Sequence, residues 1–273
     1  MRSDDRGRTF KSIAGDLPDR QDVWSVVQDH VNGNLLFAGT EFGLFCSVDA
    51  GAHWVQLKGG LPTIQVRDLA VQRRENDLVL GTFGRSLHVL DDYRPLREMT
   101  TETLAQPAAL YPLRSAYQFT ELGYPQAAWG NETTPNPPNG AVLTYSVGQP
   151  LAANTKIVFT IADDTGKQVR RLEGIPGAAG AVEPYPATAG VHRVVWNLRG
   201  DPAAAPAGGR GGAAPGAAGA GGGGGGGRGG APQGPLVPMG RFTVTMGTMT
   251  GDAVTAVGKP QTFNVVPLPA KNY

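Results

Sequence analysis

Residues 39–54 have the sequence GTEFGLFCSVDAGAHW, which predicts a strand, a tight turn and the start of another strand. The turn follows the pattern Ser-x-Asp-x-Gly-x-x-Trp, and its four defined positions are Ser47, Asp49, Gly51 and Trp54. Short β-rich runs bounded by Gly, Asn or Asp are the usual signal of strands. The stretch therefore indicates an all-β fold organised around a repeated type of turn.

The same turn pattern occurs once earlier, with Phe in the place of Trp, at Ser3, Asp5, Gly7 and Phe10. The flanking segments repeat too, since residues 23–28 match 66–72, residues 34–40 match 77–82, and residues 43–49 match 84–91. A repeat of ~40–50 residues with several short strands is typical of a β-propeller blade. We therefore expect residues 1–98 to form the C-terminal blades of an Asp-box β-propeller, about two blades plus a fraction, with residues 90–95 as a degenerate copy of the turn.

The turn pattern indicates a structural role for its carboxylates. An Asp side chain can close a turn by accepting hydrogen bonds from backbone N–H groups two or three residues further on. Gly51 allows a positive φ at little steric cost, and Trp54, or Phe10 in the first copy, buries a large apolar area. We expect Asp5 and Asp49 to hold these turns rather than to form a paired acid–base site.

The other polar candidates do not indicate a catalytic, cofactor-binding or metal site. Glu41, Asp91 and Asp92 are better placed for a surface role, although a solvated loop is the simpler interpretation. His53 and His88 stand at non-equivalent points of different repeats, so they do not form a set of metal ligands. We expect no cofactor.

Charge and cysteine content exclude several classes of function. The 273 residues carry a net charge of +1, so there is no electrostatic reason to expect nucleic acid or an anionic membrane as a partner. The single cysteine, Cys46, excludes a disulfide within the chain and a thiolate metal cluster. Because Cys46 alternates with Leu44 and Val48, we expect a small buried side chain rather than a nucleophile.

The N-terminal residues 1–7 are polar and charged, so they are unlike a signal peptide. No window approaches the roughly 20 apolar residues of a membrane span. Because Ser3 already belongs to a turn motif, we expect the chain to be the C-terminal piece of a longer protein, or a gene model begun at an internal Met. A propeller closes its ring to protect strand edges, so the missing upstream blades, in the same protein or a neighbouring chain, are the expected partner.

After residue 98 the pattern changes to a connector, expected at residues 99–140, and then to a second domain over residues 141–273. Its strands are predicted at residues 141–147, 156–162, 168–172, 191–198, 240–246 and 261–266. Short strands separated by turns, with no convincing helix, favour an Ig-like β-sandwich. We expect Trp196 to fill its core.

Residues 201–234 are rich in Gly, Ala and Pro. They cannot bury enough apolar surface to offset the entropy of ordering, so we expect a disordered loop inserted between two sandwich strands. The glycine run lacks the Lys-Ser/Thr of a phosphate-binding loop, and its two arginines are too few for a flexible nucleic-acid tail.

Residues 35–45 with the turn that follows them, and residues 81–92, resemble the sortilin-like BNR/Asp-box β-propellers of secreted bacterial proteins. In the second half, residues 163–170, 189–196 and 237–242 resemble the FlgD-type Ig-like domain. The resemblance implies a secreted, periplasmic or cell-surface parent protein, from a family often called glycosyl hydrolase-like through its similarity to xyloglucanase and sialidase propellers. That family's catalytic residues lie on blades that have no match here, so none is carried over.

Two functions follow from the sequence. The first is a non-catalytic binding or assembly module from the end of a secreted propeller protein, with a protein or a glycan as its ligand. The alternative is the C-terminal fragment of a propeller-type glycoside hydrolase whose catalytic carboxylates lie upstream. Such enzymes need two carboxylates ~5–10 Å apart on either side of the bond, and the carboxylates here show no such pairing. For this chain alone we expect no catalysis.

Overall fold

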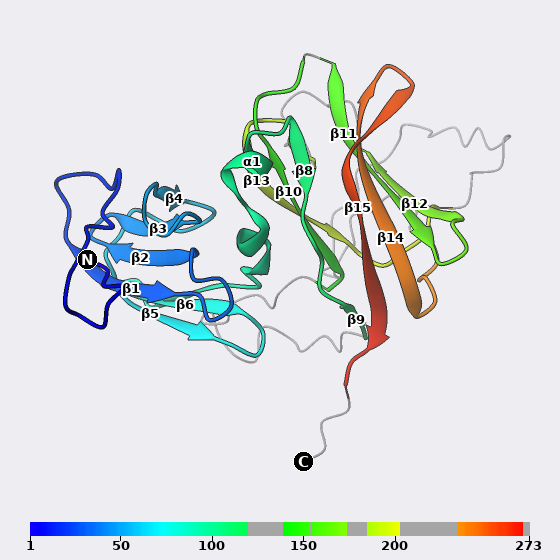
Figure 1. The fold of residues 1–273 in the computed structure, drawn as a ribbon. Coiled ribbons are helices and arrows are strands. Elements are labelled where there is room, and N and C mark those ends of the chain that lie inside the picture. Colours follow the sequence, from blue (N-terminus) through cyan, green and yellow to red (C-terminus); the bar gives the residue numbers. More distant parts are fainter. Residues whose placement is uncertain (120–138, 153, 174–184, 203–233, 270–273) are drawn as a thin grey trace, which may run out of the picture.

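The computed structural model describes residues 1–119, 139–152, 154–173, 185–202 and 234–269. Within them nearly every regular element is a strand, and the helical elements are the 3₁₀-helix η1 (Arg94–Glu98) and the short α1 (Thr101–Leu104). The all-β class expected from the sequence is confirmed. Figure 1 shows two groups of sheets joined through η1 and α1. Neither helix of the described part of the chain is long and apolar enough to cross a membrane.

The N-terminal group contains two antiparallel sheets. The first has the order β1-β2-β3-β4 and contains β1 (Val23–Gln28), β2 (Leu36–Thr40), β3 (Gly43–Ser47) and β4 (Val55–Leu57). The second has the order β5-β6-β7 and contains β5 (Val66–Gln72), β6 (Asp77–Thr82) and β7 (Leu87–Leu90). β1 lies beside β5 (Figure 1). The buried core shared by the two sheets consists of Leu35, Phe37, Leu44, Cys46, Val66, Leu69, Leu78, Leu80 and Tyr93.

Both sheets close a hairpin with a threonine hydroxyl. Thr40 Oγ1 donates to Gly43 O at 3.0 Å in the β2–β3 hairpin. Thr82 Oγ1 donates to Ser86 O at 2.6 Å in the β6–β7 hairpin. The two hairpins therefore share a closing threonine at matching positions, but its acceptor lies three residues on in the first hairpin and four residues on in the second.

Gly39 sets how closely the two N-terminal sheets approach each other. A Cβ atom at this position would lie 2.6 Å from the carbonyl oxygen of Val66 and 2.9 Å from its Cγ1. These distances are far shorter than van der Waals contact, so only glycine lets β2 pack this closely on β5.

The C-terminal group contains two sheets around one core. One sheet has the order β12-β11-β14-β15-β9 and the other has the order β13-β10-β8. The strands are β8 (Ala108–Leu110), β9 (Ala116–Gln118), β10 (Ala141–Val147), β11 (Thr155–Asp163), β12 (Gln168–Glu173), β13 (Gly190–Trp196), β14 (Gly240–Thr250) and β15 (Ala253–Pro267). Trp196 is fully buried in this core, as expected, and meets Phe242 and Phe263 in edge-on ring contacts.

The structure corrects the boundary of the connector expected at residues 99–140. β8 pairs with β10, and β9 pairs in parallel with β15, so both strands belong to the C-terminal sheets. Their small side chains Ala108 and Ala116 are buried, and the strands cover sheet edges that would otherwise be unpaired. The local sequence does not show this because the partner strands are distant in the chain.

β14 and β15 are longer than the strands expected at residues 240–246 and 261–266. They continue toward each other and form one hairpin, in which Gly251 adopts φ +60°. Residues 251–260 are almost all exposed, so no alternation of apolar side chains marks this part of the hairpin as strand.

Most of the insertion expected at residues 201–234 lies outside the described residues. The chain on its two sides is described. Gly200 N donates to Pro235 O at 2.8 Å, and Val237 N donates to Leu198 O at 2.9 Å. The segments that flank the insertion are therefore hydrogen-bonded to each other.

Candidate functional site

The carboxylate of Asp49 is engaged within its own turn. Its Oδ1 accepts hydrogen bonds from Ser47 Oγ at 2.8 Å and from the backbone N–H of His53 at 2.9 Å, and its Oδ2 lies 2.6 Å from His53 Nδ1. Gly51, at φ +92°, donates its N–H to Ser47 Oγ at 2.8 Å. Burial raises the pKa of Asp49, but the hydrogen bonds from His53 and Ser47 outweigh burial and lower the pKa to about 2. The contact with Asp49 raises the pKa of His53.

The carboxylate of Asp5 is engaged in the same way in the first copy of the turn. Its Oδ1 accepts from Thr9 N at 2.8 Å, Arg8 N at 2.9 Å and Ser3 Oγ at 2.9 Å. Its Oδ2 accepts from Thr9 Oγ1 at 2.7 Å. The hydrogen bonds from Thr9 lower the pKa of Asp5 to about 2, and Gly7 adopts φ +85°. Both turn aspartates are thus ionised acceptors at neutral pH.

The aromatic positions of the two turns differ. Trp54 is 8% exposed, and its Nε1–H donates to Ile13 O at 2.9 Å. Phe10 is 59% exposed, so the expectation that it buries a large apolar area is wrong. One isolated β-bridge, between Arg2 and Lys11, joins the two ends of the segment that contains Phe10. No strand of the described residues covers the ring.

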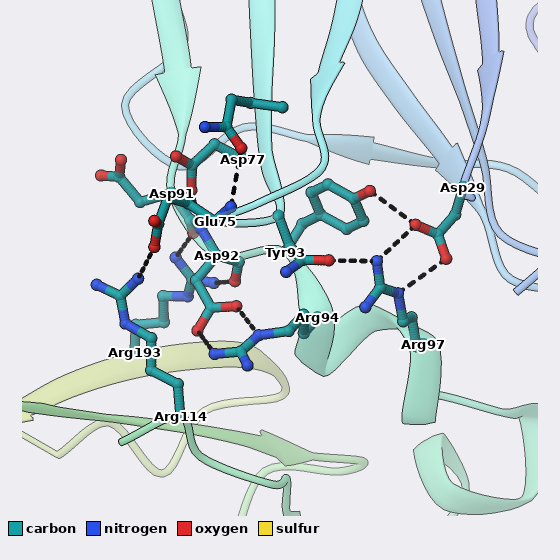
Figure 2. Close-up of polar contacts among 12 residues, drawn as sticks. Asp29, Glu75, Asp77, Asp91, Asp92, Tyr93, Arg94, Arg97, Arg114 and Arg193 are labelled. Atoms are coloured by element: carbon teal, nitrogen blue, oxygen red, sulfur yellow. Dashed lines mark hydrogen bonds and ion pairs between the residues drawn. The ribbon is translucent and has the colours of Figure 1, made fainter. Parts of the chain in front are cut away.

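Asp91 and Asp92 lie at the junction between the two groups of sheets (Figure 2). Asp92 accepts from Arg94 Nε at 2.6 Å and from Arg94 Nη2 at 2.9 Å. Arg193, on β13, donates to the backbone carbonyl of Asp91 at 2.6 Å and to that of Asp92. Burial raises the pKa of Asp91, and the neighbouring charge of Asp77 adds to this rise. These contacts attach the end of β7 to the C-terminal sheets.

The remaining sequence candidates do not join this cluster. Glu41 lies in the β2–β3 turn, where its backbone N–H donates to Asp22 O at 3.0 Å. His88 lies on β7 opposite Leu80. Cys46 is buried, and burial raises its pKa to about 12. In the part of the chain that the structure describes, no three His, Cys, Asp or Glu side chains gather as they would around a metal ion.

The sequence does not predict a second polar network at the junction. Asp29, in the loop after β1, accepts from Arg97 Nε and Nη2, both at 2.8 Å, and from the hydroxyl of Tyr93 at 2.7 Å (Figure 2). Arg97 also donates to Asn76 Oδ1 at 2.6 Å. The network joins β1, the β5–β6 loop and η1. No sequence signal marks it, because Asp29 and Arg97 are 68 positions apart.

A hollow of about 220 Å³ lies beside this network, between the β5–β6 loop and the segment that leads to β9. Three guanidinium groups line it, and two carboxylates are shared among them. Glu75 lies 3.0 Å from Arg74 Nε and 3.9 Å from Arg114 Nη1, and Asp92 pairs with Arg94. Ligand pockets usually reach at least ~300 Å³. A hollow of this size, whose guanidinium groups already lie beside carboxylates, gives little to select a ligand.

Two exposed aromatic rings and one guanidinium gather where β1 and β5 begin. We call Trp24, Arg67 and Phe83 the bulge surface, because the register shift in β1 falls at Trp24 and that in β5 falls at Arg67. Arg67 Cζ lies 3.8 Å from the ring centroid of Trp24 and 5.2 Å from that of Phe83. Trp24 is 41% exposed and Phe83 is 65% exposed. Bulges often redirect side chains next to functional sites, and here they bring equivalent positions of two repeats into contact.

No protein-family model matches this chain, and no curated protein matches it either. Among solved structures, it matches the extracellular domains of a putative one-component system and of a putative hybrid two-component system from B. thetaiotaomicron. Both are 12% identical to this chain, with TM-scores of 0.21 and 0.22. The matches cover 90% and 92% of this chain but 25% and 26% of those chains, so this chain spans about a quarter of their length. With TM-scores this low, the likeness carries no information about activity.

Proposed function

We propose that this chain is a non-catalytic module that binds a polysaccharide on the bulge surface. The observation that carries this proposal is the exposed guanidinium of Arg67, which lies over the exposed rings of Trp24 and Phe83. A sugar can pack its C–H face on an aromatic ring while its hydroxyls accept hydrogen bonds from a fixed donor next to the ring. The bulge surface offers both kinds of contact.

The engagement of the carboxylates supports binding rather than hydrolysis. A glycosidase needs two carboxylates ~5–10 Å apart that flank the bond to be broken. Asp5 and Asp49 are held within their own turns, and Asp92 is paired with Arg94. None of these three carboxylates is hydrogen-bonded to the bulge surface.

The size of the bulge surface favours a glycan over a protein as ligand. A stable protein interface covers roughly 800 Å² on each partner, far more than three side chains provide. One or two sugar residues match an area of that size. A protein partner is therefore the second candidate, and the experiment below distinguishes it.

We also propose the finer architecture that the repeats imply. The hairpins closed by Thr40 and Thr82, and the register shifts at Trp24 and Arg67, support successive blades of an Asp-box β-propeller in residues 1–98. The two sheets around one core support an Ig-like sandwich in the second half. On this proposal the parent protein is secreted or held at the cell surface, and further blades, from the same protein or a neighbouring chain, are its partner.

Affinity electrophoresis of the full chain tests the binding function. Native gels would contain xyloglucan, β-glucan or polygalacturonate. We expect at least one polysaccharide to retard the wild-type chain, and Trp24→Ala to abolish the retardation. Phe10→Ala removes an exposed aromatic ring that is not one of the two rings against Arg67, and it should leave the retardation unchanged.

Three results would overturn the proposal in different ways. Retardation that survives Trp24→Ala places the binding site elsewhere. The absence of retardation in every gel excludes these glycans and favours a protein partner. Release of reducing sugars from xyloglucan or β-glucan, abolished by Asp91→Asn or Glu41→Gln, would establish the hydrolase alternative.

A further inference from the structure

We propose that the bulge surface selects acidic polysaccharides, and that Arg67 holds the carboxylate of a uronic acid residue. This inference rests on the proposed glycan binding and names its ligand class. Arg67 is exposed, and none of the described carboxylates lies within 4.0 Å of its guanidinium. By contrast, Arg94 and Arg97 at the junction are each paired with an aspartate.

The hydrogen bonds of Arg67 leave one edge of its guanidinium free. Gln65 Oε1 accepts from Arg67 Nε at 2.9 Å and from Arg67 Nη2 at 2.7 Å. A guanidinium has five N–H groups, so the two N–H groups of Nη1 and one of Nη2 have no partner in the described residues. Nη1 and Nη2 together form the second edge of the planar group. That edge matches the two oxygens of a carboxylate, which accept in parallel.

The aromatic rings fix the direction of this free edge before a ligand arrives. Trp24 lies against the guanidinium, with its ring centroid 3.8 Å from Cζ, and Phe83 lies nearby at 5.2 Å. Gln65 restrains rotation within the plane. A donor that is already oriented loses less conformational freedom on binding. The sugar ring would then pack on the exposed part of Phe83 while its carboxylate meets Arg67.

The nearest acidic side chain along β5 does not compete for Arg67. Asp68 follows Arg67 directly, but its Oδ1 accepts from the backbone N–H of Leu69 at 2.8 Å. An incoming carboxylate therefore displaces no internal ion pair. A neutral sugar at the same place would receive ordinary hydrogen bonds instead of charge-assisted ones, which are roughly twice as strong. This difference is the physical basis of the proposed selectivity.

The experiment compares polygalacturonate with its methyl-esterified form, which has the same backbone without the charge. Affinity gels that contain each polymer, neutral xyloglucan or dextran sulfate give apparent dissociation constants for the full chain. We expect tightest binding to polygalacturonate, and a rise of about 10-fold to 100-fold in its dissociation constant for Arg67→Gln, from the loss of charge-assisted hydrogen bonds. Arg67→Lys keeps the charge but lacks the planar edge, so it should restore only part of the affinity.

The matched control is Arg85→Gln. Arg85 is also exposed and lies in the β6–β7 hairpin, so its substitution removes the same charge outside the bulge surface. We expect the dissociation constant of the Arg85→Gln variant for polygalacturonate to stay within about twofold of wild type, because exposed charges contribute little to binding without a fixed geometry.

The outcomes separate this inference from the proposed function. Equal binding of xyloglucan, esterified and free polygalacturonate, unchanged in Arg67→Gln, would keep glycan binding and refute acid selectivity. A second outcome is that Arg67→Gln and Arg85→Gln weaken polygalacturonate binding equally and that dextran sulfate binds as tightly as polygalacturonate. This outcome would show unspecific attraction of anions and refute the role of Arg67. The absence of binding to every polymer would refute both proposals.

Discussion

Asp29→Ala should destabilise the chain strongly, because Asp29 forms the buried end of an ion pair. The side chain of Asp29 has no exposed surface, and that of Arg97 is 12% exposed. The substitution leaves Arg97 without its carboxylate and removes the 2.7 Å acceptor of the Tyr93 hydroxyl. Removal of one partner of a buried ion pair costs about 3–5 kcal/mol. Because Asn76 Oδ1 still accepts from Arg97 at 2.6 Å, we expect a loss near the lower end of that range.

The destabilisation by Asp29→Ala should depend on pH. Burial raises the pKa of Asp29, but hydrogen bonds from Arg97, Asn32 and Tyr93 outweigh burial and hold the pKa well below its usual range. A carboxyl whose folded pKa is depressed stabilises the fold above its unfolded pKa, ~3.9, and this contribution is lost as the pH falls toward the folded pKa. We therefore expect the full difference in unfolding free energy from wild type at pH 7 and a smaller one at pH 3.

Urea unfolding, followed by tryptophan fluorescence and circular dichroism, measures both effects. Arg2→Ala is the matched control, because the Arg2–Asp4 pair is 43% and 49% exposed and should change the unfolding free energy by less than about 1 kcal/mol. If the unfolding free energy of Asp29→Ala lies within about 1 kcal/mol of the wild-type value at pH 7, the ion pair of Asp29 does not stabilise the contact between η1 and β1. A difference that is as large at pH 3 as at pH 7 would contradict the argument from its pKa.

Three further substitutions or reactions test the packing. Trp196→Ala empties a fully buried position and should lower the unfolding free energy by about 3–5 kcal/mol in urea. Gly51→Ala should destabilise more than Gly60→Ala in thermal melts: both glycines have a positive φ, but only at Gly51 would a Cβ lie 2.7 Å from atoms of Ile13. Equal shifts would refute the steric argument. Cys46, whose pKa burial raises to about 12, should resist iodoacetamide at pH 8 in the folded chain and react in urea, as mass spectrometry would show.

Elements with a local cause were predictable from the sequence. β10 has the bounds expected at residues 141–147, because its apolar run ends in turn residues on both sides. Trp196 was expected in the core and is buried there. The place of β8 and β9 in the C-terminal sheets was not predicted, because their partners β10 and β15 are distant in the chain. The strands expected at residues 240–246 and 261–266 were too short, because the exposed middle of the β14–β15 hairpin has no buried face.

The candidate site was less predictable than the fold. The matching of residues 23–28 with 66–72 makes Trp24 and Arg67 equivalent, but equivalence does not imply contact. The contact needs the register shifts at both positions and the packing of β1 beside β5, which in turn needs Gly39. Residues whose side chains could take part in catalysis, such as Asp49, instead close a turn.

The all-β class, the two aspartate turns and most strands can be predicted from the chain alone, because the interactions that form them span a few residues. In each turn the aspartate is bonded to groups at most four positions away. Which distant side chains meet depends on tertiary packing. It placed Arg67 on Trp24 and buried Asp29 against Arg97, since those contacts arise only when separate sheets pack together. The stretch at residues 39–54 contains both kinds of interaction. Its turn is held by local hydrogen bonds, while Gly39 allows β2 to pack closely on β5.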